Sequence, residues 1–191
     1  KLYSAMGDIN IMDNNATWAV FFNKKLMDDD GFDMPYQTVL DGKWTYDAFY
    51  ALSSAAARDL DGNGQMDDND LWGTVGAAEN TTFMFFSSGE KFIEKDENDM
   101  PVLDVLSERY VDAYAKAHAI NGNADICLSI ANAGYDFKIL DDLFTEGRCL
   151  FSFVGLNRVT LFRDMESDFG ILPTPKYDEA QEKYYNAISC W

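Results

Sequence analysis

The chain has 191 residues, 47% of them hydrophobic, which is enough for one sizeable buried core. Its formal net charge of −18, from 33 acidic and 15 basic residues, argues against nucleic acid and anionic membrane surfaces as partners, because both are bound through basic patches. No stretch approaches the roughly 18 consecutive apolar residues of a membrane span.

The first part of the chain begins with a strand pattern followed by helical patterns. An apolar, β-rich run at 16–22 predicts a buried strand, and 23–27 then predicts a short helix. A longer helix is expected over Thr45–Arg58, where the threonine can cap the first turn and Trp44 can pack onto Phe49.

The rest of the chain continues this alternation. A short run follows at 72–75, and strands are predicted at 149–154 and 169–172. A hairpin is expected at 90–94 and 100–105, and helices at 79–86, 137–147 and 156–165. A further helix is expected after the capping residue Ser107, with Val111, Tyr114 and His118 on its apolar face. Strands that alternate with helices predict the α/β class.

The motifs of common enzyme classes do not occur in the sequence. His118 is the only histidine, and its place on a predicted apolar face favours a packing role over that of a catalytic base. The chain has no Gly-x-Ser-x-Gly elbow, no HExxH, no Walker loop and no GxGxxG. Paired carboxylates are expected by chance among 33 acids, so a glycosidase is an alternative by residue type only. The sequence therefore predicts a protein that is not an enzyme.

The cysteines do not form a recognisable framework. Cys127, Cys149 and Cys190 lack both CxxC and zinc-finger spacing. Three buried thiols are the prediction, with one disulfide as the alternative.

An acidic segment at 59–70 has the spacing of a calcium-binding loop. Side-chain oxygens stand at loop positions 1, 3, 5, 9 and 12, and Gly64 is at position 6, where such loops turn sharply. The predicted ligands are Asp59, Asp61, Asn63, Gln65 through its backbone carbonyl, Asp67 and Asp70. The last position carries an aspartate in place of the longer glutamate, which predicts a Kd on the order of 10⁻⁴ to 10⁻³ M. A solvated acidic turn is the alternative.

Five phrases, in order over most of the chain, resemble one protein family. They are TWAVFFNKKL at 17–26, KWTYDAF at 43–49, SGEKF at 88–92, LFTEGRCLF at 143–151 and FGILPTPK at 169–176. Together they resemble the family 1 extracellular solute-binding proteins of ABC sugar importers, the maltose-binding-protein type. That family folds as two α/β lobes joined by chain crossings, with ligand held in the cleft between them.

This resemblance implies a periplasmic-binding-protein-like type II lobe, with a mixed sheet flanked by helices. Residues 1–191 would form a single lobe, mostly the second of the pair, with the first lobe absent from this processed chain or fragment. The two chain ends should then lie side by side. Some members of the family carry a calcium loop of this kind, which agrees with a structural calcium ion at 59–70.

The resemblance also implies which residues contact the ligand. In the family, these residues come from the loop before the first strand, from the helix start before the "GG" turn, and from the turn after a late strand. The corresponding positions are Asn14, Asn15, Glu79, Asn80, Gly155, Leu156 and Asn157. Asparagine and glutamate suit sugar hydroxyls. The family often has an aromatic residue after the late strand, which this chain lacks; Trp18 is a substitute if it faces the cleft, and a core residue otherwise.

The predicted function is capture of an extracellular solute, an oligosaccharide, for an ABC importer. The expected partners are the sugar and the membrane subunits of the importer. The expected location is extracellular, as a cell-surface lipoprotein anchored through a segment outside this chain. A calcium-dependent carbohydrate or protein interaction module is the alternative, followed by a glycosidase.

Overall fold

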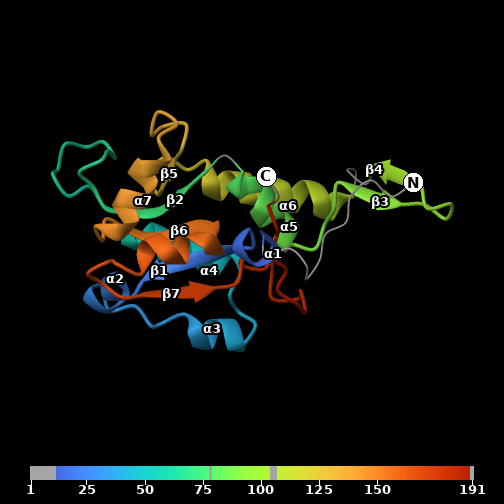
Figure 1. Ribbon diagram of the computed structural model, residues 1–191, viewed down its shortest axis with the longest axis horizontal. Helices are drawn as coiled ribbons and strands as arrows, with labels where there is room; N and C mark the ends of the chain where they lie inside the picture. The colour runs from blue at the N-terminus through green and yellow to red at the C-terminus, as the bar shows by residue number, and fades with distance from the viewer. Residues whose placement is uncertain (1–11, 78, 104–106, 190–191) are drawn as a thin grey trace.

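The computed structural model describes residues 12–77, 79–103 and 107–189, and places a sheet between two sets of helices (Figure 1). The sheet has five strands in the order β5-β2-β6-β1-β7. β5 and β6 run parallel to β2, whereas β1 is antiparallel to both of its neighbours. These strands are β1 (Trp18–Asn23), β2 (Trp72–Gly76), β5 (Cys127–Ser129), β6 (Cys149–Gly155) and β7 (Phe169–Leu172). The predicted α/β fold with a mixed sheet flanked by helices is confirmed.

The helices agree with most of the predicted positions. They are α1 (Met12–Asn15), α2 (Lys24–Asp29), α3 (Tyr36–Leu40), α4 (Tyr46–Ala56), α5 (Asn80–Ser87), α6 (Glu108–Asn121), α7 (Phe137–Thr145), η1 (Leu156–Arg158) and α8 (Val159–Phe162). The Thr45 hydroxyl accepts a hydrogen bond from the Ala48 N–H at 3.3 Å, as its capping role predicts. The single helix predicted over 156–165 is instead a 3₁₀ turn followed by α8, which ends at Phe162.

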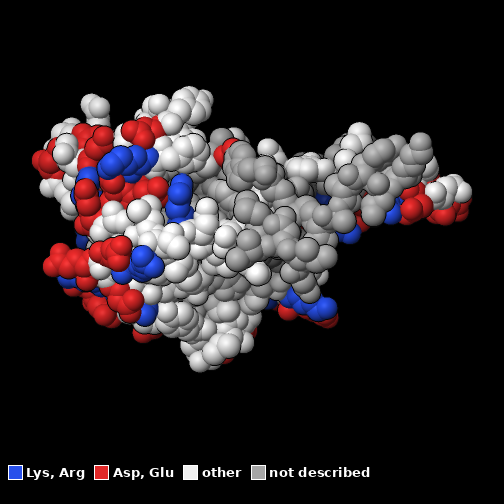
Figure 2. Space-filling view, in the orientation of Figure 1, with Lys and Arg blue, Asp and Glu red and all other residues white. Residues whose placement is uncertain are grey.

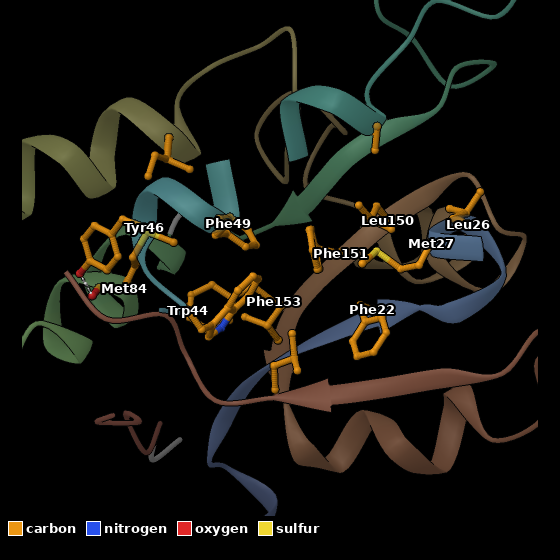
Figure 3. Close-up of a cluster of buried hydrophobic side chains, with 14 of the residues drawn as sticks. Phe22, Leu26, Met27, Trp44, Tyr46, Phe49, Met84, Leu150, Phe151 and Phe153 are labelled. Atoms are coloured by element: carbon orange, nitrogen blue, oxygen red, sulfur yellow. Dashed lines mark hydrogen bonds between the residues drawn. The ribbon is translucent and has the colours of Figure 1, made fainter. Parts of the chain in front are cut away.

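Alternate residues of β1 point into two separate cores. Val20 and Phe22 pack with α4 and α6 on one face of the sheet, whereas Ala19 and Phe21 pack with α7 and α8 on the other. Phe151 of β6 lies at the centre of the first core (Figure 3). Its ring centroid is 5.1 Å from that of Phe49 and 5.8 Å from that of Trp44.

The predicted apolar face of α6 is wrong. Val111 is 54% exposed and Tyr114 is 38% exposed, and His118 is exposed as well. The buried face carries Ala113 and Ala117, because α6 packs against α5 and small side chains allow close approach of the two helices.

A two-stranded hairpin of β3 (Ile93–Lys95) and β4 (Pro101–Leu103) projects from one end of the body (Figure 1). It is shorter than predicted, and residues 104 and 105 of the predicted second strand lie outside the described residues. Cys190 also lies outside them. Cys127 and Cys149 are buried free thiols, as predicted.

The two ends of the described chain run side by side. The Trp18 N–H donates to the Ala187 carbonyl at 2.9 Å, and the Ser189 N–H donates to the Ala16 carbonyl at 2.9 Å. These bonds flank an antiparallel bridge between Thr17 and Ile188. The chain therefore enters and leaves the described fold at one place.

Candidate functional site

The carboxyl ends of the parallel strands β2, β5 and β6 share one edge of the sheet. β1 is antiparallel to β6 and begins at the same edge, where Trp18 pairs with Gly155. The paired chain ends lie here too. Ligands of open α/β sheets bind outside the carboxyl ends of the strands, so a ligand site is expected at this edge.

A pocket of about 150 Å³ opens at this edge. Complete small-molecule pockets span roughly 300–1,000 Å³, so its size suits one part of a larger cleft. The pocket lies between the start of β1, the end of β6 and the first turns of α7. Its lining residues are Asn15, Ala16, Trp18, Ala77, Phe137, Leu140, Asp141, Val154, Gly155, Asn157, Arg158 and Ser189.

Aromatic and apolar carbon forms much of the pocket wall. Phe137, the first residue of α7, is 50% exposed, and the Asp136 carboxylate fixes this turn by accepting from the Lys138 N–H at 2.9 Å. Trp18 is only 8% exposed, since its ring packs against Phe83 with centroids 4.1 Å apart. Trp18 is therefore a core residue that also borders the pocket.

An ion pair supplies the charge in the pocket wall. The Arg158 Nε lies 3.3 Å from the Asp141 Oδ1. Burial raises the pKa of the Asp141 carboxyl, and the nearby Arg158 guanidinium opposes that rise. The pair connects α7 to η1 beside the amide groups of Asn15 and Asn157.

Two of the ligand residues predicted from the resemblance line the pocket, namely Asn15 and Asn157, together with Gly155. Gly155 lets the Asn15 backbone and the Asn157 side chain lie close to β6. A Cβ at position 155 would lie 3.0 Å from the Asn157 Oδ1 and 3.2 Å from the Asn15 carbonyl oxygen.

The other four predicted residues are not among the lining residues. Asn80 is buried, and its Oδ1 accepts from the Ala77 N–H at 3.2 Å, which fixes the turn before α5. Leu156 packs against the second core. Asn14 is exposed, and Glu79 is half-buried.

Sequence reasoning missed Phe137, Asp141 and Arg158. Their signal was present only in part, because Phe137 opens a predicted helix and Asp141 lies one turn after it. Their meeting with Arg158 depends on how α7 packs beside the end of β6, which no local pattern reports.

The acidic segment 59–70 folds as a tight loop between α4 and β2. One oxygen from each of Asp59, Asp61 and Asp70 can be chosen so that all three lie within 4.8 Å of one another. Asp59 accepts from the N–H groups of Gly62 and Gly64 at 2.6 and 2.7 Å. Asp70 is fully buried. The donor set is all oxygen, which fits a hard cation such as calcium.

Hydrogen bonds keep two carboxylates of this loop ionised. The Gly64 N–H and other donors hold the pKa of Asp59 below its usual range. The Asn69 N–H and the Asn63 side chain do the same for the pKa of Asp67. The loop therefore presents charged oxygens well below neutral pH.

The surface charge is unevenly distributed, and the two described thiols are not activated. Acidic side chains gather at one end of the viewed face, near α2 and α7 (Figure 2). Burial raises the pKa of the Cys127 thiol to about 12, and that of Cys149 is raised as well, so neither suits a nucleophile. No described helix is long and apolar enough to cross a membrane.

No family model and no curated protein matches the chain. Several solved structures, however, are similar to it in fold. An ABC substrate-binding protein from Listeria monocytogenes in complex with cycloalternan has a TM-score of 0.60 at 18% identity, covering 81% of this chain and 36% of that one. The maltotriose-binding protein of Thermus thermophilus gives 0.58 at 18% identity, covering 88% and 39%.

A third similar structure is the maltose/maltodextrin-binding domain from Bdellovibrio bacteriovorus bound to maltotriose. Its TM-score is 0.57 at 17% identity, covering 84% of this chain and 37% of that one. The likeness predicted from the five phrases is confirmed at the level of the fold. The chain spans well under half the length of these binding proteins.

Proposed function

We propose that this chain is a ligand-binding lobe of an extracellular solute-binding protein, which captures an oligosaccharide for an ABC importer. The pocket at the carboxyl edge of the sheet supports this function. It combines apolar carbon with amide and charged groups, as sugar sites require, because a sugar presents both C–H faces and hydroxyl groups. The similar structures include complexes with maltotriose, raffinose and cycloalternan.

The observation that carries the proposal is that both ends of the described chain contribute to this pocket. Asn15 comes from the incoming end and Ser189 from the outgoing end. A second lobe attached through these ends would face the pocket directly and would close it. Closure of two lobes around a ligand is a common binding motion, and the small volume of the pocket alone fits half of such a cleft.

Saturation-transfer difference NMR with the 191-residue chain tests the proposal. Maltotriose and raffinose are suitable neutral probes, and millimolar concentrations suit the weak binding expected of one lobe. We expect saturation transfer to at least one probe, with amide shifts confined to α7, η1 and the start of β1. Absence of transfer to both probes, and to cycloalternan, would reject the function.

Replacement of Phe137 with alanine is expected to weaken this binding. An aromatic contact contributes about 0.5–1.5 kcal/mol, so the Kd should rise about twofold to thirteenfold. A titration of amide shifts measures the change. Tyr50→Ala is the matched control, because Tyr50 is a 39% exposed aromatic on α4 outside the pocket lining. Equal affinities of the Phe137 variant and the unmodified chain would contradict a role in stacking.

We also propose that the loop 59–70 binds a structural calcium ion through Asp59, Asp61, Asn63, the Gln65 carbonyl, Asp67 and Asp70. The clustered carboxylate oxygens support this assignment. The loop follows α4 and precedes β2, and the Asp67 carbonyl accepts from the Trp72 indole N–H at 3.1 Å. Calcium would therefore steady the entry to a core strand at a distance from the sugar.

The remaining parts of the proposal concern the whole protein. Its partners would be the membrane subunits of the importer, and its location would be the cell surface, through a lipid anchor outside this chain.

The pocket lining suits binding better than hydrolysis. Glycosidases use two carboxylates, and the described lining offers one, Asp141, which Arg158 already engages.

A further inference from the structure

The described lining of the pocket contains one acidic and one basic side chain, and they neutralise each other. Asp141 and Arg158 form their ion pair at 3.3 Å, and the other ten lining residues carry no side-chain charge. The described lining is thus electroneutral, within a chain whose net charge is −18. An anionic ligand would find no unpaired cation among these residues.

Both members of the pair are partly withdrawn from water. The Asp141 side chain is 16% exposed and the Arg158 side chain is 35% exposed. Loss of either partner would leave the other as an uncompensated charge in the wall. Among the described residues, Arg158 makes this one ion pair, through Nε. The terminal nitrogens of Arg158 make no hydrogen bond to a described residue, and the side chain is 35% exposed, so they can donate to a ligand.

We propose that the Asp141–Arg158 pair selects neutral sugars over anionic ones. The guanidinium donates hydrogen bonds to ligand hydroxyls, while the carboxylate cancels the charge that would otherwise attract a uronate. This inference rests on the proposed sugar-binding function and adds the chemical class of the sugar. It also implies that Arg158 can bind an anion once Asp141 no longer pairs with it, because the geometry of an unpaired guanidinium matches that of a carboxylate.

Removal of the carboxylate charge tests the proposal as a gain of function. Asp141→Asn is expected to strengthen binding of trigalacturonate at least about tenfold and to weaken binding of maltotriose or raffinose severalfold. The matched control is Asp142→Asn, because Asp142 is ion-paired with Lys138 on the same helix outside the pocket lining. Kd values from amide-shift titrations give the readout, and a melting curve of each variant verifies folding.

The double variant Asp141→Asn with Arg158→Gln separates the latent cation from a general change in charge. It should lose the gained affinity for trigalacturonate. If Asp141→Asn does not fold, Arg158→Gln alone decides the question. It must weaken the neutral sugar without binding trigalacturonate, and unchanged neutral affinity overturns the proposal.

The outcomes separate this inference from the proposed function. The inference is supported if Asp141→Asn binds trigalacturonate more tightly than the unmodified chain, while Asp142→Asn and the double variant do not. No gain, or an equal gain in Asp142→Asn, overturns it. An unmodified chain that prefers trigalacturonate to the neutral probes also overturns it, while sugar capture stands. An unmodified chain that binds no sugar overturns both.

Discussion

Calcium at about 10 mM is expected to raise the melting temperature of the chain by about 5–11 °C. If the Kd is about 10⁻⁴ M, this concentration is about a hundredfold excess, which stabilises the folded state by about 2.7 kcal/mol. For a chain of this length, each kcal/mol shifts the melting temperature by about 2–4 °C. Differential scanning calorimetry with calcium, and with a chelator, measures the shift. Identical melting points under the two conditions would contradict the site.

The variant Asp61→Asn tests whether the effect comes from the loop. The Asp61 side chain is exposed and accepts hydrogen bonds from Asn63 within the loop, so folding without calcium should change little. The calcium-dependent shift should largely disappear. Asp96→Asn is the matched control, because Asp96 accepts comparable backbone hydrogen bonds in the β3–β4 turn, far along the chain from the loop. Magnesium should stabilise less, since it demands stricter octahedral geometry.

The calcium effect should also depend on pH with a defined sign. The pKa values of Asp59 and Asp67 are lower in the folded chain than usual. Stability from these carboxylates is therefore present above their unfolded pKa values and is lost as the pH falls through the lowered folded values. The calcium-dependent shift should persist through mildly acidic pH and vanish only at stronger acidity.

Replacement of Phe151 with alanine is expected to lower the free energy of unfolding by about 3–5 kcal/mol, the cost of a large cavity in a packed core. Phe151 is fully buried, and its strand β6 lies between β2 and β1. Its ring packs against Phe49 and Trp44, both of which are also fully buried, so the site cannot collapse easily. Urea unfolding followed by tryptophan fluorescence measures the loss.

Ile171→Ala serves as the control for this loss. Ile171 also lies in the sheet, but on the edge strand β7, and it is 40% exposed. Its replacement should cost much less than that of Phe151. Comparable losses for the two variants would mean that the centre of the sheet is not the main source of stability.

Local patterns in the sequence predicted most individual elements but not how they meet. The strand over 16–22, the capped helix beginning after Thr45 and the apolar runs of β6 and β7 were all visible as periodicity or capping residues. The apolar face of α6 was predicted wrongly, because the prediction followed the large residues Val111 and Tyr114, whereas the buried residues are alanines. Packing distance between helices decides such cases, and hydrophobicity alone does not report it.

The acidic loop could be predicted from the sequence, whereas most of the pocket could not. The spacing of 59–70 identified the acidic loop because its residues are consecutive. The pocket is assembled from the two chain ends, β6 and α7, which are distant in sequence. The resemblance supplied Asn15 and Asn157, but it also supplied Asn80, whose side-chain oxygen accepts a hydrogen bond in the turn before α5. Phe137, Asp141 and Arg158 depend on tertiary packing.

The pairing of Ala16 with Ser189 makes the described fold a unit suited to domain insertion. Host loops accept a guest most readily when the guest's termini are close together, and a 2.9 Å hydrogen bond joins these two residues. A fluorescent protein opened at a surface loop could therefore receive residues 15–189 with short linkers and little strain on either partner. Because Asn15 and Ser189 border the pocket, a ligand bound there would act directly on both junctions, and the chimera would report the ligand as a change in brightness.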